Sequence, residues 1–453
     1  MKVLVLWPPH VPSYFNAGHH ISTFLTAGHL RTLDAVDSVR AIDAGALNYT
    51  WKELGDLLFQ ERFDVIAVIN DFDNVDDLPR LLKYVRTLSP GTKVVTAGRL
   101  SAQSPLSFRE FDLDAVVVGG GDPEAGVAAY VRHLAEPSGP PPAGVALRGQ
   151  DPAQAPAGLF LRPDAWVLPD VTEIPYEAYE RLYQRDQNKF CGIPQRRELV
   201  VPAARGCPVN CSFCEVPTFQ GLKDRRLTVE RTLGYIEESF ARHPFEYVAF
   251  YAPTFTLDRK WTAHLCRELI ARGSKYPWKC ATTIAHLGDE LLDLMARSGC
   301  VRVSVGVETL DPAGHDALPR LKRLEQERYE RLAASCARLG VELNCFVIVG
   351  LPGTTVAGTA HTAHTIRAAQ GRVRPTVYSS MDRLRAAASP EEAAAFNRQL
   401  LHPDDVPDAE TAQSLYGLVY GREDWVTPVT ERVPQRGTDA VPERSTESLE
   451  RAR

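Results

Sequence analysis

Short apolar runs alternate with amphipathic segments over the first third of the chain. The runs are rich in Val and Ile, and the segments between them have the spacing of surface helices. Strands that are apolar on both faces and alternate with helices are typical of a doubly wound parallel sheet. The pattern therefore predicts an α/β domain over residues 1–136, with strands at residues 3–6, 38–42, 65–69, 93–97 and 115–118.

The same alternation resumes in the second half of the chain. Six strands are predicted at residues 199–203, 247–251, 279–284, 301–307, 343–349 and 376–379, with helices between them. Six such units over residues 198–380 predict a partial (β/α)6 barrel, whose active site lies at the carboxyl ends of the strands.

The remaining segments are expected to be small. Residues 137–197 begin with a proline-rich stretch and are predicted to form a linker with a hairpin, residues 144–148 against 158–162. Residues 381–428 are predicted to form a small helical extension. Residues 429–453 are charged and poor in aromatic side chains, which predicts a disordered tail.

Composition excludes several classes of function. The chain has 453 residues, with 51 Lys and Arg against 57 Asp and Glu, a formal net charge of -6. A protein that binds nucleic acid through bulk positive charge is therefore not expected. No run of about 18 apolar residues is present, so no membrane helix is expected. The first residues read as a strand rather than a signal peptide, and we expect a cytoplasmic protein.

The nine cysteines are distributed unevenly. None precedes Cys191 and none follows Cys345. An odd number in a reducing compartment does not indicate a disulfide framework. Six cysteines are scattered singly and are expected to be small buried side chains: Cys191, Cys266, Cys280, Cys300, Cys336 and Cys345.

The other three, Cys207, Cys211 and Cys214, share one loop after the first predicted barrel strand. Thiolates bind iron–sulfur clusters, zinc or cuprous copper. A structural zinc site would need a fourth ligand, which usually comes from a second pair of ligands. The chain contains no second CxxC pair and no HxxxH pair. A redox pair of Cys211 and Cys214 would leave Cys207 without a role. Three thiolates on a cubane cluster would leave one iron open to chelate S-adenosylmethionine (SAM).

The motif CxxxCxxC, with Phe213 before its last cysteine, resembles that of the radical SAM superfamily. The surrounding Arg-Gly-Cys-Pro-x-x-Cys-x-Phe-Cys resembles the cobalamin-binding branch in particular. The resemblance implies one [4Fe-4S] cluster whose metal ligands and catalytic residues are Cys207, Cys211 and Cys214.

Three further segments resemble SAM-binding parts of the family. Ala252, Pro253 and Thr254 follow the second strand, where relatives receive the methionyl amino group, although the acid of most relatives is replaced here by Ala252. Gly-Val-Glu-Thr after the fourth strand implies contacts from Glu308 and Ser304. The segment after the fifth strand implies packing against adenine by Val349 and Gly350.

The first domain resembles Rossmann-like cobalamin-binding domains. The Asp-x-His-x-x-Gly signature is absent, as it commonly is in the resembling branch. Turns at the strand ends become possible cobalamin contacts: Pro8, Asn70, Gly98, Gly119, Gly120 and Gly121. They could equally be plain turns, and a nicotinamide site would require G-x-G-x-x-G in place of the prolines. We expect His10, His19 and His20 to lie in an exposed loop or, otherwise, near the lower face of cobalt.

The resemblance implies a cobalamin-dependent radical SAM enzyme that methylates an unactivated carbon of a small-molecule or peptide natural-product precursor. It also implies an electron donor of the flavodoxin or ferredoxin type. The cysteine-free ends predict a single cluster. Alternatives are a ring-rearranging or cyclising enzyme, a radical SAM enzyme with a vestigial cobalamin domain, and a cobalamin-binding sensor.

Overall fold

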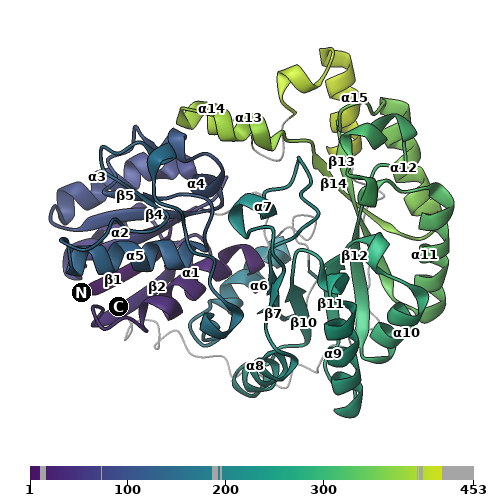
Figure 1. The fold of residues 1–453 in the computed structure, drawn as a ribbon, viewed down its shortest axis with the longest axis horizontal. Coiled ribbons are helices and arrows are strands. Elements are labelled where there is room, and N and C mark those ends of the chain that lie inside the picture. Colours follow the sequence, from purple (N-terminus) through teal and green to yellow (C-terminus); the bar gives the residue numbers. More distant parts are fainter. Residues whose placement is uncertain are drawn as a thin grey trace.

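The computed structural model describes residues 1–10, 17–72, 74–185, 192–193, 196–394, 396 and 401–420. Two α/β units lie beside each other, with the N-terminal unit on the left of Figure 1 and the second unit on the right. Cys191 and the predicted disordered tail, residues 429–453, lie outside the described residues.

The N-terminal unit is built on a six-stranded sheet in the order β2-β1-β3-β4-β5-β6. Five strands are parallel and the edge strand β6 is antiparallel to β5. Separate apolar cores cover the two faces, so the sheet is doubly wound, as predicted. The strands are β1 (Lys2–Trp7), β2 (Ser38–Asp43), β3 (Val65–Asn70), β4 (Lys93–Gly98), β5 (Ala115–Val117) and β6 (Val145–Leu147).

The helices of this unit divide between the two faces of the sheet. One core contains residues of α1 (Ala17–Leu30) and α5 (Pro123–Ala135). The other contains residues of α2 (Trp51–Gln60), α3 (Leu78–Leu88) and the short α4 (Arg99–Gln103).

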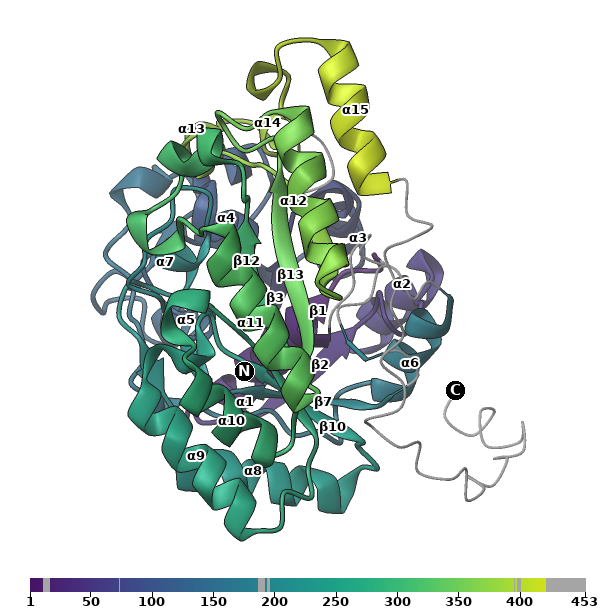
Figure 2. The same cartoon turned by 90° about the vertical axis from the view of Figure 1, so that its right-hand side faces the viewer.

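The second unit contains six parallel strands in the order β14-β13-β12-β11-β10-β7. The two end strands do not pair, which makes a partial barrel, as predicted. Figures 1 and 2 show the helices on its outer side. The strands are β7 (Glu198–Pro202), β10 (Tyr247–Tyr251), β11 (Trp278–Thr282), β12 (Cys300–Glu308), β13 (Glu342–Val349) and β14 (Arg372–Val377); the helices are α8 (Val229–Arg242), α9 (Arg259–Ala271), α10 (Asp289–Arg297), α11 (Gln326–Leu339) and α12 (Val356–Ala368).

The predicted hairpin in the linker is wrong. Residues 145–147 form β6 and pair with β5, whereas residues 158–162 form no strand. Instead, the backbone N–H groups of Asp122 and Leu161 make bonds that hold residues 159–161 against the start of α5. Pairing with β5 buries residues 145–147 in the first sheet, and this pairing is favoured over a local hairpin with residues 158–162. The linker also contains α6 (Tyr176–Arg185).

The predicted C-terminal extension divides between the two units. α13 (Met381–Ala386) and α14 (Pro390–Ala394) add side chains to a core of the N-terminal unit, and the Ser104 hydroxyl donates to the Ala387 carbonyl. α15 (Ala409–Tyr420) instead packs on the barrel, where Leu415 and Val419 contact the cluster around Val349. The segment after β14 therefore returns to the first unit, as Figure 1 shows.

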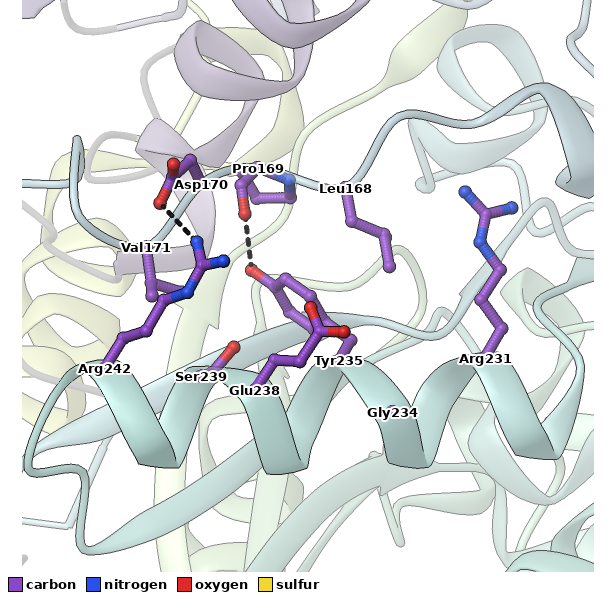
Figure 3. A pocket seen from close by; sticks show the side chains of 10 residues that line it. All are labelled: Leu168, Pro169, Asp170, Val171, Arg231, Gly234, Tyr235, Glu238, Ser239 and Arg242. Carbon is purple, nitrogen blue, oxygen red and sulfur yellow. Dashed lines mark hydrogen bonds and ion pairs between the residues drawn. The ribbon is translucent and has the colours of Figure 1, made fainter.

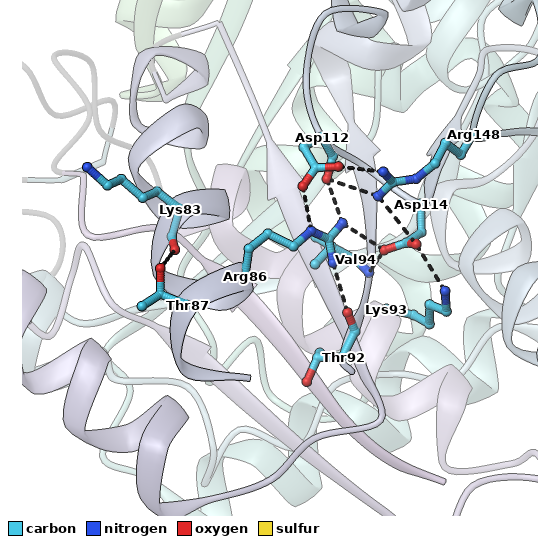
Figure 4. Close-up of polar contacts among 9 residues, drawn as sticks. All are labelled: Lys83, Arg86, Thr87, Thr92, Lys93, Val94, Asp112, Asp114 and Arg148. Atoms are coloured by element: carbon cyan, nitrogen blue, oxygen red, sulfur yellow. Dashed lines mark hydrogen bonds and ion pairs between the residues drawn. The ribbon is translucent and has the colours of Figure 1, made fainter. Parts of the chain in front are cut away.

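An ion-pair network surrounds Asp114, immediately before β5 (Figure 4). Arg86 contacts Asp112 and Asp114, and both carboxylates also contact Arg148. Lys93 approaches Asp114 to 3.2 Å. Burial alone would raise the pKa of Asp114, but its bond from the Val94 N–H and the neighbouring cations lower it overall. The network links α3, β4 and the residue that follows β6. It lies at the amino ends of the parallel strands, opposite the edge formed by their carboxyl ends.

The expectation that His20 lies in an exposed loop is wrong. His20 lies on α1, is fully buried, and its Nδ1 is 2.6 Å from the carboxylate of Asp43. Its ring packs on Trp7, with ring centroids 4.2 Å apart. His10 is half-buried against Asp77, and the side chain of His19 lies outside the described residues. Among the helices described, none is long and apolar enough to cross a bilayer.

Candidate active site

The cysteine loop is closed at its base by a two-stranded ribbon. β8 (Ala204–Arg205) pairs antiparallel with β9 (Arg225–Arg226), so residues 206–224 leave the barrel and return to it. The Cys207 N–H donates to the Gly221 carbonyl, and the Cys214 N–H donates to the Cys211 carbonyl. The loop is thus held by its own backbone at the carboxyl end of β7, the position predicted for the site.

Three residues of this loop have positive φ: Gly206, Asn210 and Gly221. Gly206 has a φ of 85°, and a Cβ there would lie 2.1 Å from the Lys223 carbonyl oxygen, so only glycine fits. Asn210 has a φ of 54° and precedes Cys211. The turns at Gly206 and Asn210 come immediately before Cys207 and Cys211 and direct the chain into the loop.

Glu308 and Lys322 form an ion pair next to the cysteines. Lys322 Nζ lies 2.8 Å from Glu308 Oε1, and both side chains are largely buried. Burial raises the pKa of Cys211 to about 11, while the charge of Lys322 acts in the opposite direction. Glu308 has a φ of 60° at a break in the register with β13. This backbone conformation is costly for any residue other than glycine. It places the Glu308 carboxylate against Lys322.

The loop also contacts two other predicted segments. The Thr254 hydroxyl lies 3.7 Å from Cys207 Sγ. Arg226 on β9 donates to the carbonyls of Thr254 and Phe255, which fixes that segment beside the loop. Phe213 packs against an apolar cluster at the carboxyl end of β13 that includes Ile348 and Leu351. Residues from four strand ends therefore meet at the cysteines.

Not every predicted SAM contact faces this site. Ser304 accepts a bond of 3.1 Å from Asn344 Nδ2, on the same face of the sheet as Glu308. Val349 is buried among side chains of β14 and α15, so its side chain points to the other face. A Cβ on Gly350 would lie 2.5 Å from Leu401. Val349 and Gly350 would therefore meet a ligand on this face through their backbone.

Three glycines at the carboxyl edge of the first sheet lie so close to other backbone atoms that a Cβ would not fit. A Cβ on Gly98 would lie 1.9 Å from the Asn70 carbonyl oxygen, and one on Gly121 would lie 2.6 Å from the Leu159 nitrogen. A Cβ on Gly119 would come within 2.5 Å of the Ala102 oxygen. Close packing within the chain thus explains why these three residues are glycines.

The other predicted contacts differ from one another. Around Gly120, no atom lies within 4 Å of a built Cβ, so this position is open. The side chain of Asn70 bonds Thr96 and the Ser101 N–H, which gives it a structural role. Pro8 follows β1 and is buried.

A buried charge network joins the two units below the loop. Asp122, at the start of α5, makes two bonds with Arg225, at 2.7 and 3.0 Å. Arg205 lies 2.5 Å from Glu124 and 3.3 Å from Asp122. Trp166 lies against both guanidinium groups, 4.5 Å from that of Arg205. All four charged side chains are at most 8% exposed.

The donor set fits an iron–sulfur cluster better than a single metal ion. All three cysteines are free thiols, and Thr254 and Lys322 lie beside them. Within the residues described, no three His, Cys, Asp or Glu side chains are close enough to hold one ion. A cubane cluster keeps its cysteine ligands farther apart than one ion does, because each thiolate binds a different iron. The five described single cysteines are buried, as predicted.

One surface cavity lies elsewhere, between α8 and residues 168–171 (Figure 3). Its volume is about 430 Å³, and Tyr235 donates to the Pro169 carbonyl at its centre. Arg242 and Asp170 face each other at one end, 3.5 Å apart. It contains none of the predicted site residues and lies on the helical side of the barrel.

Two site residues escaped the sequence analysis. Glu215 follows the last cysteine directly, and Lys322 lies in the loop between β12 and α11. The position of Glu215 next to the motif was an available signal. Nothing in the spacing of Lys322 indicates that it lies near the cysteines.

The fold and the cysteine loop define the class. Residues 201–366 match the model of the radical SAM superfamily, and this part of the chain is a radical SAM domain. The chain is 24% identical over 383 residues to cytidylyl-2-hydroxyethylphosphonate methyltransferase of Streptomyces wedmorensis, covering 79% of this chain and 70% of that protein. It is also 26% identical over 204 residues to an anaerobic magnesium-protoporphyrin IX monomethyl ester cyclase of Rubrivivax gelatinosus, covering 43% of this chain and 36% of that protein.

A solved structure extends the similarity to both units. The radical S-adenosylmethionine methyltransferase TsrM from Kitasatospora setae, with cobalamin and a [4Fe-4S] cluster bound, aligns with a TM-score of 0.69 at 16% identity. The alignment covers 92% of this chain and 90% of that one. The chain therefore has the two-unit fold of that enzyme, with an N-terminal sheet ahead of the radical SAM barrel.

Proposed function

We propose that this protein is a cobalamin-dependent radical SAM methyltransferase that transfers a methyl group to carbon. One observation carries the proposal: the carboxyl edge of the N-terminal sheet meets the cysteine loop of the barrel. The Gly120 N–H donates to the Thr218 carbonyl, four residues beyond Cys214. Ligands of open α/β sheets bind at this edge, so a ligand of the first sheet would face the cluster loop.

The chain's own residues would hold the cofactors and exclude water. Cys207, Cys211 and Cys214 would hold the [4Fe-4S] cluster and leave one iron open for SAM. The Glu308–Lys322 pair and Thr254 would contact the amino-acid part of SAM. Cobalamin, when bound, would carry the methyl group between SAM and the substrate. Gly120 would approach it through the backbone, because that position alone among the predicted glycines has open space around it.

The expected substrate is a small molecule or a peptide. Reduction of the cluster would need an electron donor, and we propose a flavodoxin or ferredoxin. Free thiols and a cluster with an open iron suit a reducing compartment, so we propose that the enzyme works in the cytoplasm.

The proposal is tested by cofactor loading and isotope transfer. After anaerobic reconstitution, one cluster corresponds to about four irons per monomer. Hydroxocobalamin should bind, and label from the SAM methyl group should reach the product. About eight irons would contradict the single cluster, and failure to bind hydroxocobalamin would contradict the cobalamin role.

A second candidate is a cyclisation or ring rearrangement without methyl transfer. The similarity to the magnesium-protoporphyrin ester cyclase favours it, although that match covers less of the chain. A product that contains no label from methyl-labelled SAM, in a reaction that still consumes substrate, would select this alternative.

A further inference from the structure

We propose that Arg99 and Glu215 form a positioning contact that holds the cluster loop at a set place over the ligand edge of the N-terminal sheet. This inference rests on the proposed function, because it concerns the relative placement of the two cofactors. Arg99 follows β4 and Glu215 follows Cys214, and the two are 116 residues apart in the chain.

The contact is buried and charged. Arg99 Nη2 lies 2.5 Å from Glu215 Oε1, and Arg99 Nη1 lies 3.0 Å from Asp71 Oδ2. The three side chains are 10–14% exposed. Burial alone would lower the pKa of Arg99, but the two carboxylates more than offset this and raise it. A planar guanidinium can serve two carboxylates at once, so the arginine bridges the two units.

Arg99 is itself held in place from its own unit. The Phe72 ring lies 5.4 Å from the guanidinium carbon, and the Phe72 N–H donates to Asp71. Because β3 ends at Asn70 and β4 at Gly98, Asp71 and Arg99 both lie at the carboxyl edge where a ligand would bind. The arginine therefore links the position of that edge to the position of the loop.

Glu215 is held by its backbone as well. Gln103 Nε2 on α4 donates to the Glu215 carbonyl at 2.9 Å. α7 (Val216–Phe219) begins at the next residue. Three bonds from the first unit, from Arg99, Gln103 and Gly120, thus reach the five residues that follow the last cysteine. The first unit therefore contacts the loop directly after its last cluster ligand.

This arrangement points to a role in catalysis rather than in stability alone. Methyl transfer between SAM and cobalamin requires the two to approach within reacting distance. Misplacement of reacting groups by about 1 Å costs on the order of 10²-fold in rate. The Arg99–Glu215 contact is a positioning contact, because neither residue is placed on the cluster or on SAM.

The test compares Glu215→Gln and Arg99→Lys with wild type in the full chain. Glu215→Gln keeps the Asp71–Arg99 pair intact, so it should fold. Arg31→Gln is the matched control: Arg31 also joins the first unit to a glutamate outside it, Glu173, at 2.6 Å, but the pair is exposed and lies near the start of β2. Circular dichroism and urea unfolding check that each variant is folded.

The assay needs no substrate. Each protein is loaded with iron, sulfide and hydroxocobalamin, reduced with titanium(III) citrate, and mixed with methyl-labelled SAM. Reduced cobalamin supplies both electrons of the new cobalt–carbon bond, the carbon–sulfur bond breaks, and S-adenosylhomocysteine leaves. The rate constant is expressed per mole of bound cobalamin.

Both variants should bind iron and cobalamin as wild type does, while the transfer rate constant falls about 10–100-fold. The control should transfer at the wild-type rate. The effect of the reduced cluster on the relaxation of the cob(II)alamin EPR signal, which depends on their separation, should change in the variants and not in the control.

Equal transfer rates in wild type and Glu215→Gln would overturn the inference. So would a loss of rate that is fully explained by lost iron or cobalamin, because the contact would then be only structural. If wild type itself fails to bind hydroxocobalamin, the proposed function is refuted, and the positioning role falls with it. The two failures are therefore distinct.

Discussion

Replacing Asp122 by Ala tests the buried network that joins the two units. Asp122 is 1% exposed and accepts bonds from Arg225, Arg205 and the Leu161 N–H. Truncation leaves two arginines buried in the interface. Arg205 keeps its carboxylate partner Glu124. Arg225 loses the carboxylate of Asp122, but it retains the carbonyls of Leu161 and Gln220 and the ring of Trp166.

The expected loss is large for a single substitution. Removing one partner of a buried ion pair costs about 3–5 kcal/mol, because the other charge stays in a poorly solvated place. A typical domain is stable by about 5–15 kcal/mol. The Asp122→Ala protein should therefore unfold at clearly lower urea concentration. Asp122→Asn, which keeps the shape of the side chain, should lose less, about 1.5–3 kcal/mol.

Urea unfolding of the reduced apoprotein is followed by circular dichroism, because the chain has six tryptophans and its total emission would not report on Trp166 alone. Asp164→Asn is the control, since Asp164 is 65% exposed and should change stability by no more than about 0.5 kcal/mol. An Asp122→Ala protein within about 1 kcal/mol of wild type would refute the reasoning.

Three further substitutions follow from the structure. Gly98→Ala should cost about 1–3 kcal/mol in urea unfolding, since its Cβ would press on the Asn70 carbonyl; a stability equal to wild type would contradict so close an approach of the two backbones. Asp114→Asn should lower stability at neutral pH, where the carboxylate is paired with Arg86. Because its pKa is lowered in the folded state, that stability is present above the unfolded pKa and is lost as pH falls through the folded pKa. Unfolding curves of wild type and Asp114→Asn should therefore converge in acid, and a gap that persists there would count against this explanation. Cys211→Ala should lower iron content from about four per monomer toward zero after reconstitution, and full retention of iron would exclude it as a ligand.

The sequence alone was sufficient to predict the fold class, which the structure confirms. It also supplied the three cysteines that we propose as cluster ligands. Both depend on short-range information. Strand and helix alternation is set by local apolar periodicity, and the three cysteines lie within eight residues with spacings that suit a cluster. The buried single cysteines followed from side-chain chemistry alone.

Tertiary contacts decided what periodicity could not. The apolar run at residues 145–147 pairs with β5 rather than with residues 158–162, because the first sheet offers a larger apolar surface than a local hairpin. His20 is buried because Asp43 and Trp7, distant in sequence, surround it.

The same limit applies to the site. Val349 was predicted from its motif, but the register of β13 turns its side chain toward α15. Glu215 and Arg99 meet across 116 residues, and Asp122 and Arg225 across 103. The sequence by itself determined the parallel strands of both units, and it suggested Cys207, Cys211 and Cys214 as the cluster ligands. Only the tertiary structure decided how the first sheet meets the cysteine loop, because that depends on packing and charge pairing between segments that no local pattern connects.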